Sequence, residues 1–180
     1  QSPYANDIAP FVDAINRVRT ARTWDKVVFT LDWLSAAQLE GRTTFCKEGT
    51  PGAELLPGLE VDYSKDIIFK KDKDDSFCLD GGLPEARSGC ARLGDVLGSL
   101  GNHASDTCLY FVGQRFERCI LKTVMHAAEL GYESVIIDEA TFTKDQDPDP
   151  EWSLPATCTN EAIRCSDVYL ARKAAGRRLS

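Results

Sequence analysis

Two kinds of apolar pattern alternate along this sequence, and their alternation limits the folds that it can adopt. Short runs rich in β-branched and aromatic residues, which are typical of buried strands, lie at 26–33, 66–70, 107–113 and 134–138. Stretches with a helical apolar period lie at 7–22, 90–100, 117–130 and 160–175. This alternation predicts an α/β fold with a mostly parallel sheet between two layers of helices, a three-layer α/β/α sandwich. The final residues 177–180 are expected to begin a fifth strand.

The length and the charge of the chain limit its class. The 180 residues are enough for one domain with a sizeable core, so we expect a single domain over residues 1–180. The net charge of −7 argues against a nucleic-acid partner, because phosphate binding needs clustered Lys and Arg. No stretch approaches the roughly 18 apolar residues of a membrane-spanning helix, so no membrane span is expected.

The cysteines of the chain favour free thiols. They number seven, none has C-x-x-C spacing, and only two histidines accompany them, which argues against a structural zinc site. The simplest interpretation is a set of reduced thiols in an intracellular compartment, either the cytoplasm or an organelle. Partial disulfide pairing in a secreted protein is the alternative.

One cysteine, Cys119, lies where the strand-like run 107–113 gives way to a helical stretch. In the first turn of a helix, free backbone N–H groups and the helix dipole stabilise a thiolate and can hold the oxyanion that forms when it attacks a carbonyl. Lys70 and Asp32 each end a predicted strand, so we expect the three side chains at one edge of the sheet. The alternatives are a buried structural cysteine, a solvated lysine and an aspartate that binds loop backbone groups.

Three longer motifs carry a family resemblance. In chain order they are GTPGAELLPGL at 49–59, DIIFKKDKDDSF at 66–77 and CILKTVMHAAELGYESVIIDEAT at 119–141. Together they resemble the isochorismatase-like cysteine hydrolases, whose fold is Rossmann-like, and the strand FTLDW at 29–33 resembles the nicotinamidase branch of that superfamily. The similarity extends to ARKAAG at 171–176. The resemblance implies a hydrolase of a small amide or a related C–N substrate.

The resemblance also implies roles for single residues. In this family a cysteine nucleophile works with a lysine and an aspartate, and here Cys119 matches the nucleophile and Lys70 the lysine. Asp32 matches a metal ligand of the nicotinamidase branch, but Leu34 and Phe45 stand where that branch has histidines. One carboxylate is not a transition-metal site, so we expect no catalytic metal and no cofactor.

Two departures from the family bear on activity. The family's catalytic aspartate lies on a central first strand, in a stretch like D-x-Q-x-D-F that should precede Gln1, and nothing in this chain matches it. An unpaired central edge is costly, so we expect an upstream segment or a partner chain to supply that strand. The turn before Cys119 usually carries small residues and a cis peptide in the family, whereas here it contains Arg115 and Phe116.

Two hypotheses follow from these observations. In the first, the protein is a metal-independent cysteine hydrolase in which Cys119 attacks and Lys70 stabilises charge. The candidate substrate-binding or oxyanion-site residues are Arg115, Phe116 and Asp32. In the second, it is a catalytically degenerate isochorismatase-fold protein, a pseudoenzyme that serves as a structural or interaction subunit of an oligomer or larger assembly.

Three other features of the sequence are not expected to take part in catalysis or metal binding. His126 follows Cys119 by one heptad and is expected to be an ordinary core or surface histidine, and His103 is expected to be solvated. The acidic stretch 145–151 begins like a calcium loop but lacks the glycine at its sixth position. We expect this stretch to be a solvated loop.

Overall fold

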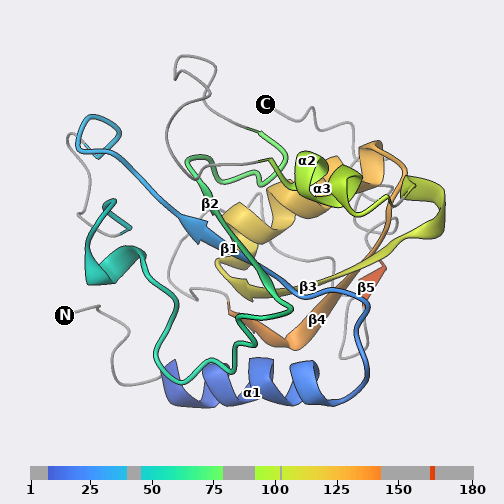
Figure 1. Ribbon diagram of the computed structural model, residues 1–180, viewed down its shortest axis with the longest axis horizontal. Helices are drawn as coiled ribbons and strands as arrows, with labels where there is room; N and C mark the ends of the chain where they lie inside the picture. The colour runs from blue at the N-terminus through green and yellow to red at the C-terminus, as the bar shows by residue number, and fades with distance from the viewer. Residues whose placement is uncertain (1–7, 40–45, 79–91, 102, 143–162, 165–180) are drawn as a thin grey trace. The chain divides into compact units, whose positions relative to one another are not determined.

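The computed structural model describes residues 8–39, 46–78, 92–101, 103–142 and 163–164. The chain divides into two compact units, residues 1–96 and 97–180, and each unit has a sheet of its own (Figure 1). The first sheet has the strand order β1-β2 and the second the order β3-β4-β5. No helix among the described residues is long and apolar enough to cross a membrane.

The first unit begins with helix α1 (Ile8–Thr20), whose buried apolar side chains are Phe11, Val12 and Ala14. Trp24 follows the helix, and its indole N–H is shared between the carbonyl oxygens of Val18 and Arg19, at 3.2 and 3.1 Å. The last carbonyl groups of a helix lack intrahelical partners. The tryptophan therefore caps the end of α1.

The two strands of the first unit, β1 (Val28–Asp32) and β2 (Ile67–Lys71), run parallel (Figure 1). Their register pairs Asp32 with Lys71, so both strands end at the same level. Leu31 and Phe69 are buried in this pair of strands. The connection between the strands contains the 3₁₀ turn η1 (Pro51–Ala53).

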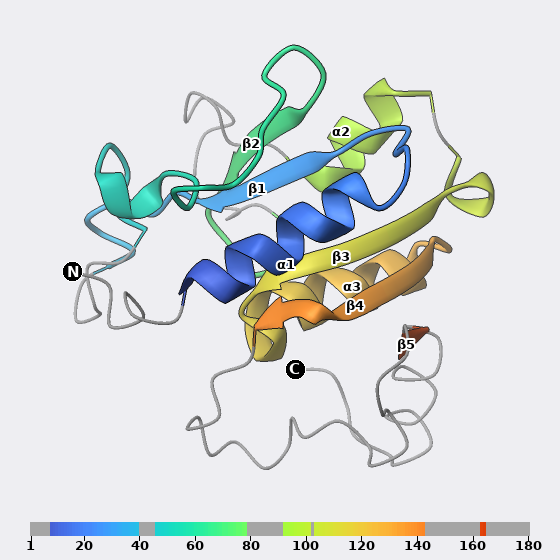
Figure 2. The same ribbon diagram turned by 90° about the horizontal axis from the view of Figure 1, so that it is seen from below.

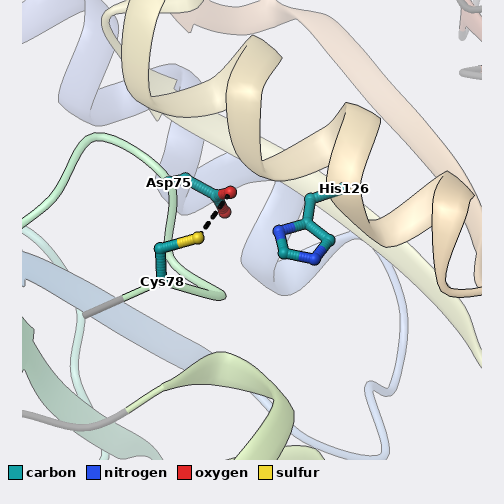
Figure 3. Close-up of side chains that lie close together, drawn as sticks. All are labelled: Asp75, Cys78 and His126. Carbon is teal, nitrogen blue, oxygen red and sulfur yellow. Dashed lines mark hydrogen bonds between the residues drawn. The ribbon is translucent and has the colours of Figure 1, made fainter. Parts of the chain in front are cut away.

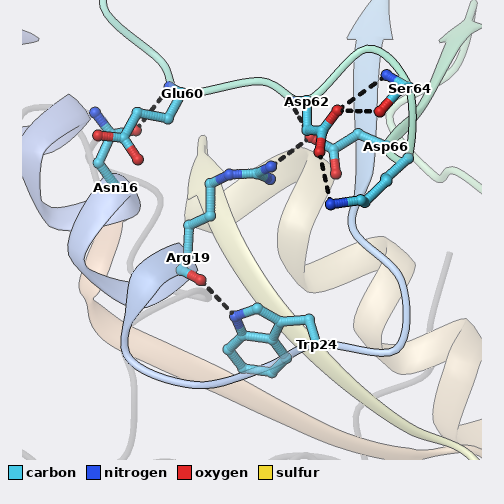
Figure 4. Close-up of polar contacts among 8 residues, drawn as sticks. Asn16, Arg19, Trp24, Glu60, Asp62, Ser64 and Asp66 are labelled. Atoms are coloured by element: carbon cyan, nitrogen blue, oxygen red, sulfur yellow. Dashed lines mark hydrogen bonds and ion pairs between the residues drawn. The ribbon is translucent and has the colours of Figure 1, made fainter.

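Polar contacts join α1 to the segment that leads into β2 (Figure 4). The Asn16 side chain donates to the Gly58 carbonyl and accepts from the Glu60 N–H, both at 2.9 Å. Arg19 forms an ion pair with Asp66 at 2.7 Å, and the Asp66 side chain is only 4% exposed. A buried ion pair therefore connects the last turn of the helix to the start of the strand.

The second unit contains a βαβ element made of β3 (Cys108–Gln114), α3 (Leu121–Glu129) and β4 (Glu133–Phe142), with the two strands parallel (Figure 2). Helix α2 (Leu93–Ser99) crosses the boundary between the units, and the 3₁₀ turn η2 (Ala104–Asp106) precedes β3. The short strand β5 (Ile163–Arg164) pairs with β4 in the antiparallel direction.

The core of the second unit forms where α3 and the turn before it meet the sheet. Its buried members are Phe116, Ile120, Leu121, Val124, Met125 and Ile136, and the half-buried Phe111 packs against them. The members at positions 120, 121, 124 and 125 follow the helical period, so they share one face of the helix. Val124 and Ile136 are at most 1% exposed.

The expected strands at 26–33, 66–70, 107–113 and 134–138 are all present, and so are the helices expected at 7–22 and 90–100. The stretch 117–130 is a π-helix, Phe116–Ile120, followed by α3. These elements, with parallel pairing of β1 to β2 and of β3 to β4, confirm the α/β fold.

The prediction of a helix over 160–175 is wrong at its described residues, Ile163 and Arg164, which form β5. They pair with Ile136 and Val135 of β4. A helical period reflects local spacing only, whereas the backbone groups of a neighbouring strand offer partners that the period does not reveal. The strand expected at 177–180 and the acidic loop at 145–151 lie outside the described residues.

The single domain over residues 1–180 stays a prediction. Within the described part of the chain, β1 pairs with β2 alone and β3 with β4 alone. The addition of a further strand to β1 or β3 likewise stays a prediction.

Candidate active site

Cys119 lies in the π-helix that joins β3 to α3. In this turn the Leu121 N–H donates to the carbonyl groups of Phe116 and Arg118, so the backbone is wider than an α-helix. Within the described part of the chain Cys119 is not in a disulfide, and the residue is half-buried. A half-buried thiol beside the first turns of a helix is in the position that the sequence predicted for a nucleophile.

The turn before the cysteine has an unusual backbone conformation. Gly113 has a φ of +126°, which strongly favours glycine, and the Gln114–Arg115 peptide bond is cis. Arg115 is extended, with φ −97° and ψ 136°, and its carbonyl accepts from the N–H groups of Arg118 and Ile120 at 3.2 and 3.3 Å. These two N–H groups are used within the turn, so an oxyanion would have to be held by others.

The two bulky residues of this turn differ in burial. Phe116 is 6% exposed and belongs to the hydrophobic core of the unit, so its side chain anchors the start of the helix. Arg115 is half-buried. The Phe116 side chain therefore cannot contact an oxyanion, although its backbone amide stays a candidate donor, and a substrate contact by Arg115 stays a prediction.

Thr123, which the sequence did not single out, contacts the backbone of Cys119. Its hydroxyl donates to the Cys119 carbonyl at 2.6 Å, and the residue is 3% exposed. Threonine hydroxyls often bond the carbonyl four residues earlier in a helix, so the i, i+4 spacing of the two residues was the available signal. The contact fixes the backbone of the cysteine where the π-helix becomes α3.

In the first unit, the two lysines at the end of β2 have different surroundings. The Lys70 ammonium lies 3.4 Å from the centre of the Trp33 ring, a cation–π contact. Lys71 is 2% exposed, and its ammonium forms an ion pair with Asp32 at the end of β1. Successive side chains of a strand point to opposite faces, which explains how neighbouring lysines reach different partners.

A second thiol, Cys46, lies near the Asp32–Lys71 pair. Its backbone φ is +59°, in the left-handed region that non-glycine residues rarely adopt. Burial and, to a smaller extent, the negative charge of Asp32 raise the pKa of the Cys46 thiol to about 11, although the charge of Lys71 acts to lower it. Cys46 is therefore protonated near neutral pH and is a poor nucleophile.

A third thiol, Cys78, lies in the turn after β2 and donates to an Asp75 carboxylate oxygen at 3.3 Å (Figure 3). The other oxygen of Asp75 accepts the Phe77 N–H at 2.9 Å. Burial and the bond to Asp75 raise the pKa of Cys78. His126, labelled in the same figure, belongs to α3 of the second unit and is half-buried.

The residues at Asp32 do not fit the metal site of the nicotinamidase branch. The Asp32 carboxylate is paired with an ammonium, and the side chain of Leu34 offers no ligand atom. The backbone of Leu34 pairs with the segment 46–48, accepting from the Glu48 N–H and donating to the Cys46 carbonyl, both at 2.9 Å. Phe45 lies outside the described residues.

The predicted site residues therefore fall in two groups. Asp32 and Lys70 end neighbouring strands of the first unit, whereas Arg115, Phe116 and Cys119 form one turn of the second. In the first group, however, the partner of Asp32 is Lys71, while the Lys70 ammonium lies over Trp33. A shared site for Lys70 and Cys119 stays a prediction.

Comparison with known proteins identifies the family. The isochorismatase domain matches residues 2–155 of this chain. No curated protein sequence matches the chain.

Several solved structures are similar to this chain. PnC1 from L. infantum, in complex with nicotinate, is 21% identical, with a TM-score of 0.63 over 92% of this chain and 76% of that chain. N-carbamoylsarcosine amidase from Thermoplasma acidophilum is 16% identical, with a TM-score of 0.59 over 79% of this chain and 74% of that chain. A nicotinamidase/pyrazinamidase from Acinetobacter baumanii is 20% identical, with a TM-score of 0.57 over 76% of this chain and 74% of that chain. At these identities the likeness shows the fold.

Proposed function

This chain belongs to the isochorismatase family, and we propose that it is a metal-independent cysteine hydrolase of a small amide or a related C–N substrate. The observation that carries the proposal is the position of Cys119, a half-buried cysteine in the helical turn that directly follows a parallel strand. Two of the similar structures are amidases by name, which supports a C–N substrate.

The proposed reaction has two steps. The Cys119 thiolate attacks the carbonyl carbon of the substrate, the C–N bond breaks, and a thioester forms while the amine leaves with a proton. Water then attacks the thioester, which releases the carboxylic acid and returns the thiol. Backbone N–H groups of the turn at Phe116 would hold the oxyanion in both steps.

The proton that the leaving amine needs limits the expected rate. The family assigns proton transfer to an aspartate that has no match in this sequence. General acid–base help contributes about 10²–10⁴ in rate, so we expect the 180-residue chain by itself to be a slow amidase. Lys70 and Lys71 are both candidates for the cation that stabilises charge, and Lys71 is the one with the buried ion pair.

The alternative function, a degenerate subunit without catalysis, is favoured by one specific observation. The small residues usual in the turn are replaced by Arg115 and by Phe116, whose side chain fills core space. We propose a structural or interaction role in a larger assembly as the second candidate.

The test is an amide hydrolysis assay of the 180-residue chain with nicotinamide and simple primary amides, followed by ammonia release. The variant is Cys119→Ala, and the matched control is Cys108→Ala, because Cys108 is another half-buried cysteine of the same unit. We expect slow turnover that Cys119→Ala abolishes and Cys108→Ala preserves. Mass spectrometry of the quenched reaction should show an acyl group on the peptide that contains Cys119.

Three results would change the conclusion. Turnover that survives Cys119→Ala would remove the cysteine mechanism. Turnover at ordinary enzyme rates would refute the expected need for a missing proton donor. An absence of both turnover and acylation, with native folding of the chain, would favour the structural role.

A further inference from the structure

The ammonium of Lys71 is fully occupied inside the first unit. The residue is 2% exposed, and its Nζ forms an ion pair and a hydrogen bond with the Asp32 carboxylate. It also donates to the Lys73 carbonyl at 2.9 Å and to the Asp74 carbonyl at 3.5 Å. A lysine has three N–H donors, and three acceptors surround this one.

We propose that the Lys71 ammonium is the resident cation of the Asp32 carboxylate. It takes the place that the nicotinamidase branch gives to a metal ion, and it closes this carboxylate to divalent ions. The inference rests on contacts within the first unit, so it holds whether or not Cys119 is catalytic.

The backbone dictates this pairing. β1 and β2 are parallel and in register at Asp32 and Lys71, so the two side chains start from paired positions at the ends of their strands. The Trp33 N–H donates to the Lys71 carbonyl at 2.7 Å, which extends the ladder beyond this pair. The turn that follows β2 then supplies two carbonyl oxygens to the same ammonium.

The charge balance explains why an ion would be excluded. An ammonium with this burial is stable only when it is paired and hydrogen-bonded, and Asp32 supplies the opposite charge. A divalent ion at the same carboxylate would lie within a few ångströms of a fixed positive charge, where repulsion is strong. The carboxylate therefore has its counter-ion already, and Leu34 adds no ligand that could compensate.

The first test rebuilds the family's ligand set with and without the lysine. Leu34→His and Phe45→His restore the two imidazoles that the resemblance places beside Asp32. Co²⁺ is titrated into this double variant and into the triple variant that also carries Lys71→Met, with visible absorbance and metal analysis after dialysis as readouts. We expect the affinity for Co²⁺ to rise by roughly 100-fold when the lysine is removed. The matched control is Lys70→Met in place of Lys71→Met, which should leave the affinity unchanged.

The second test needs no added ligands and covers the case of a variant that does not fold. Thermal unfolding is compared for Lys71→Met, Asp32→Asn, the double variant and Lys70→Met. Either single substitution at the pair should lower the Tm by roughly 10 °C, because one charge is left without its partner. The fall in Tm of the double variant should be smaller than the sum of the falls in the two single variants. Lys70→Met should lower the Tm by only a few degrees.

The outcomes separate clearly. Stoichiometric metal in the wild-type chain that Asp32→Asn abolishes would overturn the inference, and so would tight Co²⁺ binding by the double-histidine variant with Lys71 in place. Strictly additive Tm losses at Asp32 and Lys71 would also overturn it. None of these readouts uses amide turnover, so failure here is distinct from failure of the proposed function.

Discussion

Removal of the Asp66 charge is expected to destabilise the first unit strongly. Asp66 Oδ2 lies 2.7 Å from Arg19 Nη2, with side-chain exposures of 4% and 18% (Figure 4). The same carboxylate oxygen accepts the Asp62 N–H at 2.7 Å. In Asp66→Asn the guanidinium of Arg19 loses its counter-charge while it stays largely buried.

The magnitude follows from the burial of both groups. Loss of one partner from a buried ion pair costs about 3–5 kcal/mol of unfolding free energy. Asparagine keeps an acceptor oxygen, and Arg19 keeps some exposure, so we expect about 3 kcal/mol. Arg19 is already short of partners, because its buried Nη1 makes no hydrogen bond within the described part of the chain. The cation–π contact of Arg19 with Phe29, at 5.9 Å, is too weak to replace the carboxylate.

The assay is urea unfolding followed by tryptophan fluorescence. Trp24 caps α1 through the carbonyl of Arg19, so its emission reports on this region. The matched control is Lys65→Met at the neighbouring position, since the Lys65 side chain is 80% exposed and its ion pair with Asp62 is on the surface. The control should leave the midpoint almost unchanged.

Two results would refute this reasoning. One is a loss of unfolding free energy in Asp66→Asn that is no larger than the loss in Lys65→Met. The other is a double variant, Arg19→Met with Asp66→Leu, that is no more stable than either single charge removal, because an apolar pair should recover most of the loss.

Three further predictions concern single groups. The pKa of Cys46 is raised from 9.0 to about 11, so this thiol stabilises the fold below pH 9, and the contribution is lost as the pH rises toward 11. The rate at which iodoacetamide modifies Cys46 should therefore rise with pH, with a midpoint near pH 11. The pKa of Asp62 is lowered from 3.8 to about 2, chiefly by hydrogen bonds from Ser64, so Asp62 stabilises the fold above pH 3.8 and loses this effect as the pH falls toward 2. In Ser64→Ala the pKa of Asp62, measured by NMR titration, should rise. Thr123→Val should slow any Cys119-dependent turnover through kcat, whereas Thr123→Ser should restore it; equal rates in both variants would exclude positioning by the hydroxyl.

Local sequence patterns are enough to predict single helices and strands of this chain. The strand at 26–33 and the helix at 7–22 follow from apolar periodicity, because side-chain spacing and backbone conformation are linked within one element. The position of Cys119 between a strand and a helix follows in the same way. The family motifs predicted the overall fold, and the match of the isochorismatase domain to residues 2–155 confirms that prediction.

Periodicity could not foresee how α3 begins. The stretch 117–130 reads as one continuous helix, but its start, Phe116–Ile120, is a π-helix. Its first residue, Phe116, is buried in the same core cluster as Ile136, a residue of β4. Such packing lies outside any local window of sequence.

The two lysines at the end of β2 show most clearly what the sequence determined and what only the tertiary structure decided. The sequence places a positive charge at this strand end, and the family motif selected Lys70. Consecutive residues of a strand face opposite sides, so a difference of one position changes the surroundings of the side chain. The ladder that pairs Asp32 with Lys71 puts the ammonium of Lys71 in the interior and leaves that of Lys70 on Trp33. Only the pairing of two strands 39 positions apart in the chain fixes that choice, because it sets which lysine meets a carboxylate.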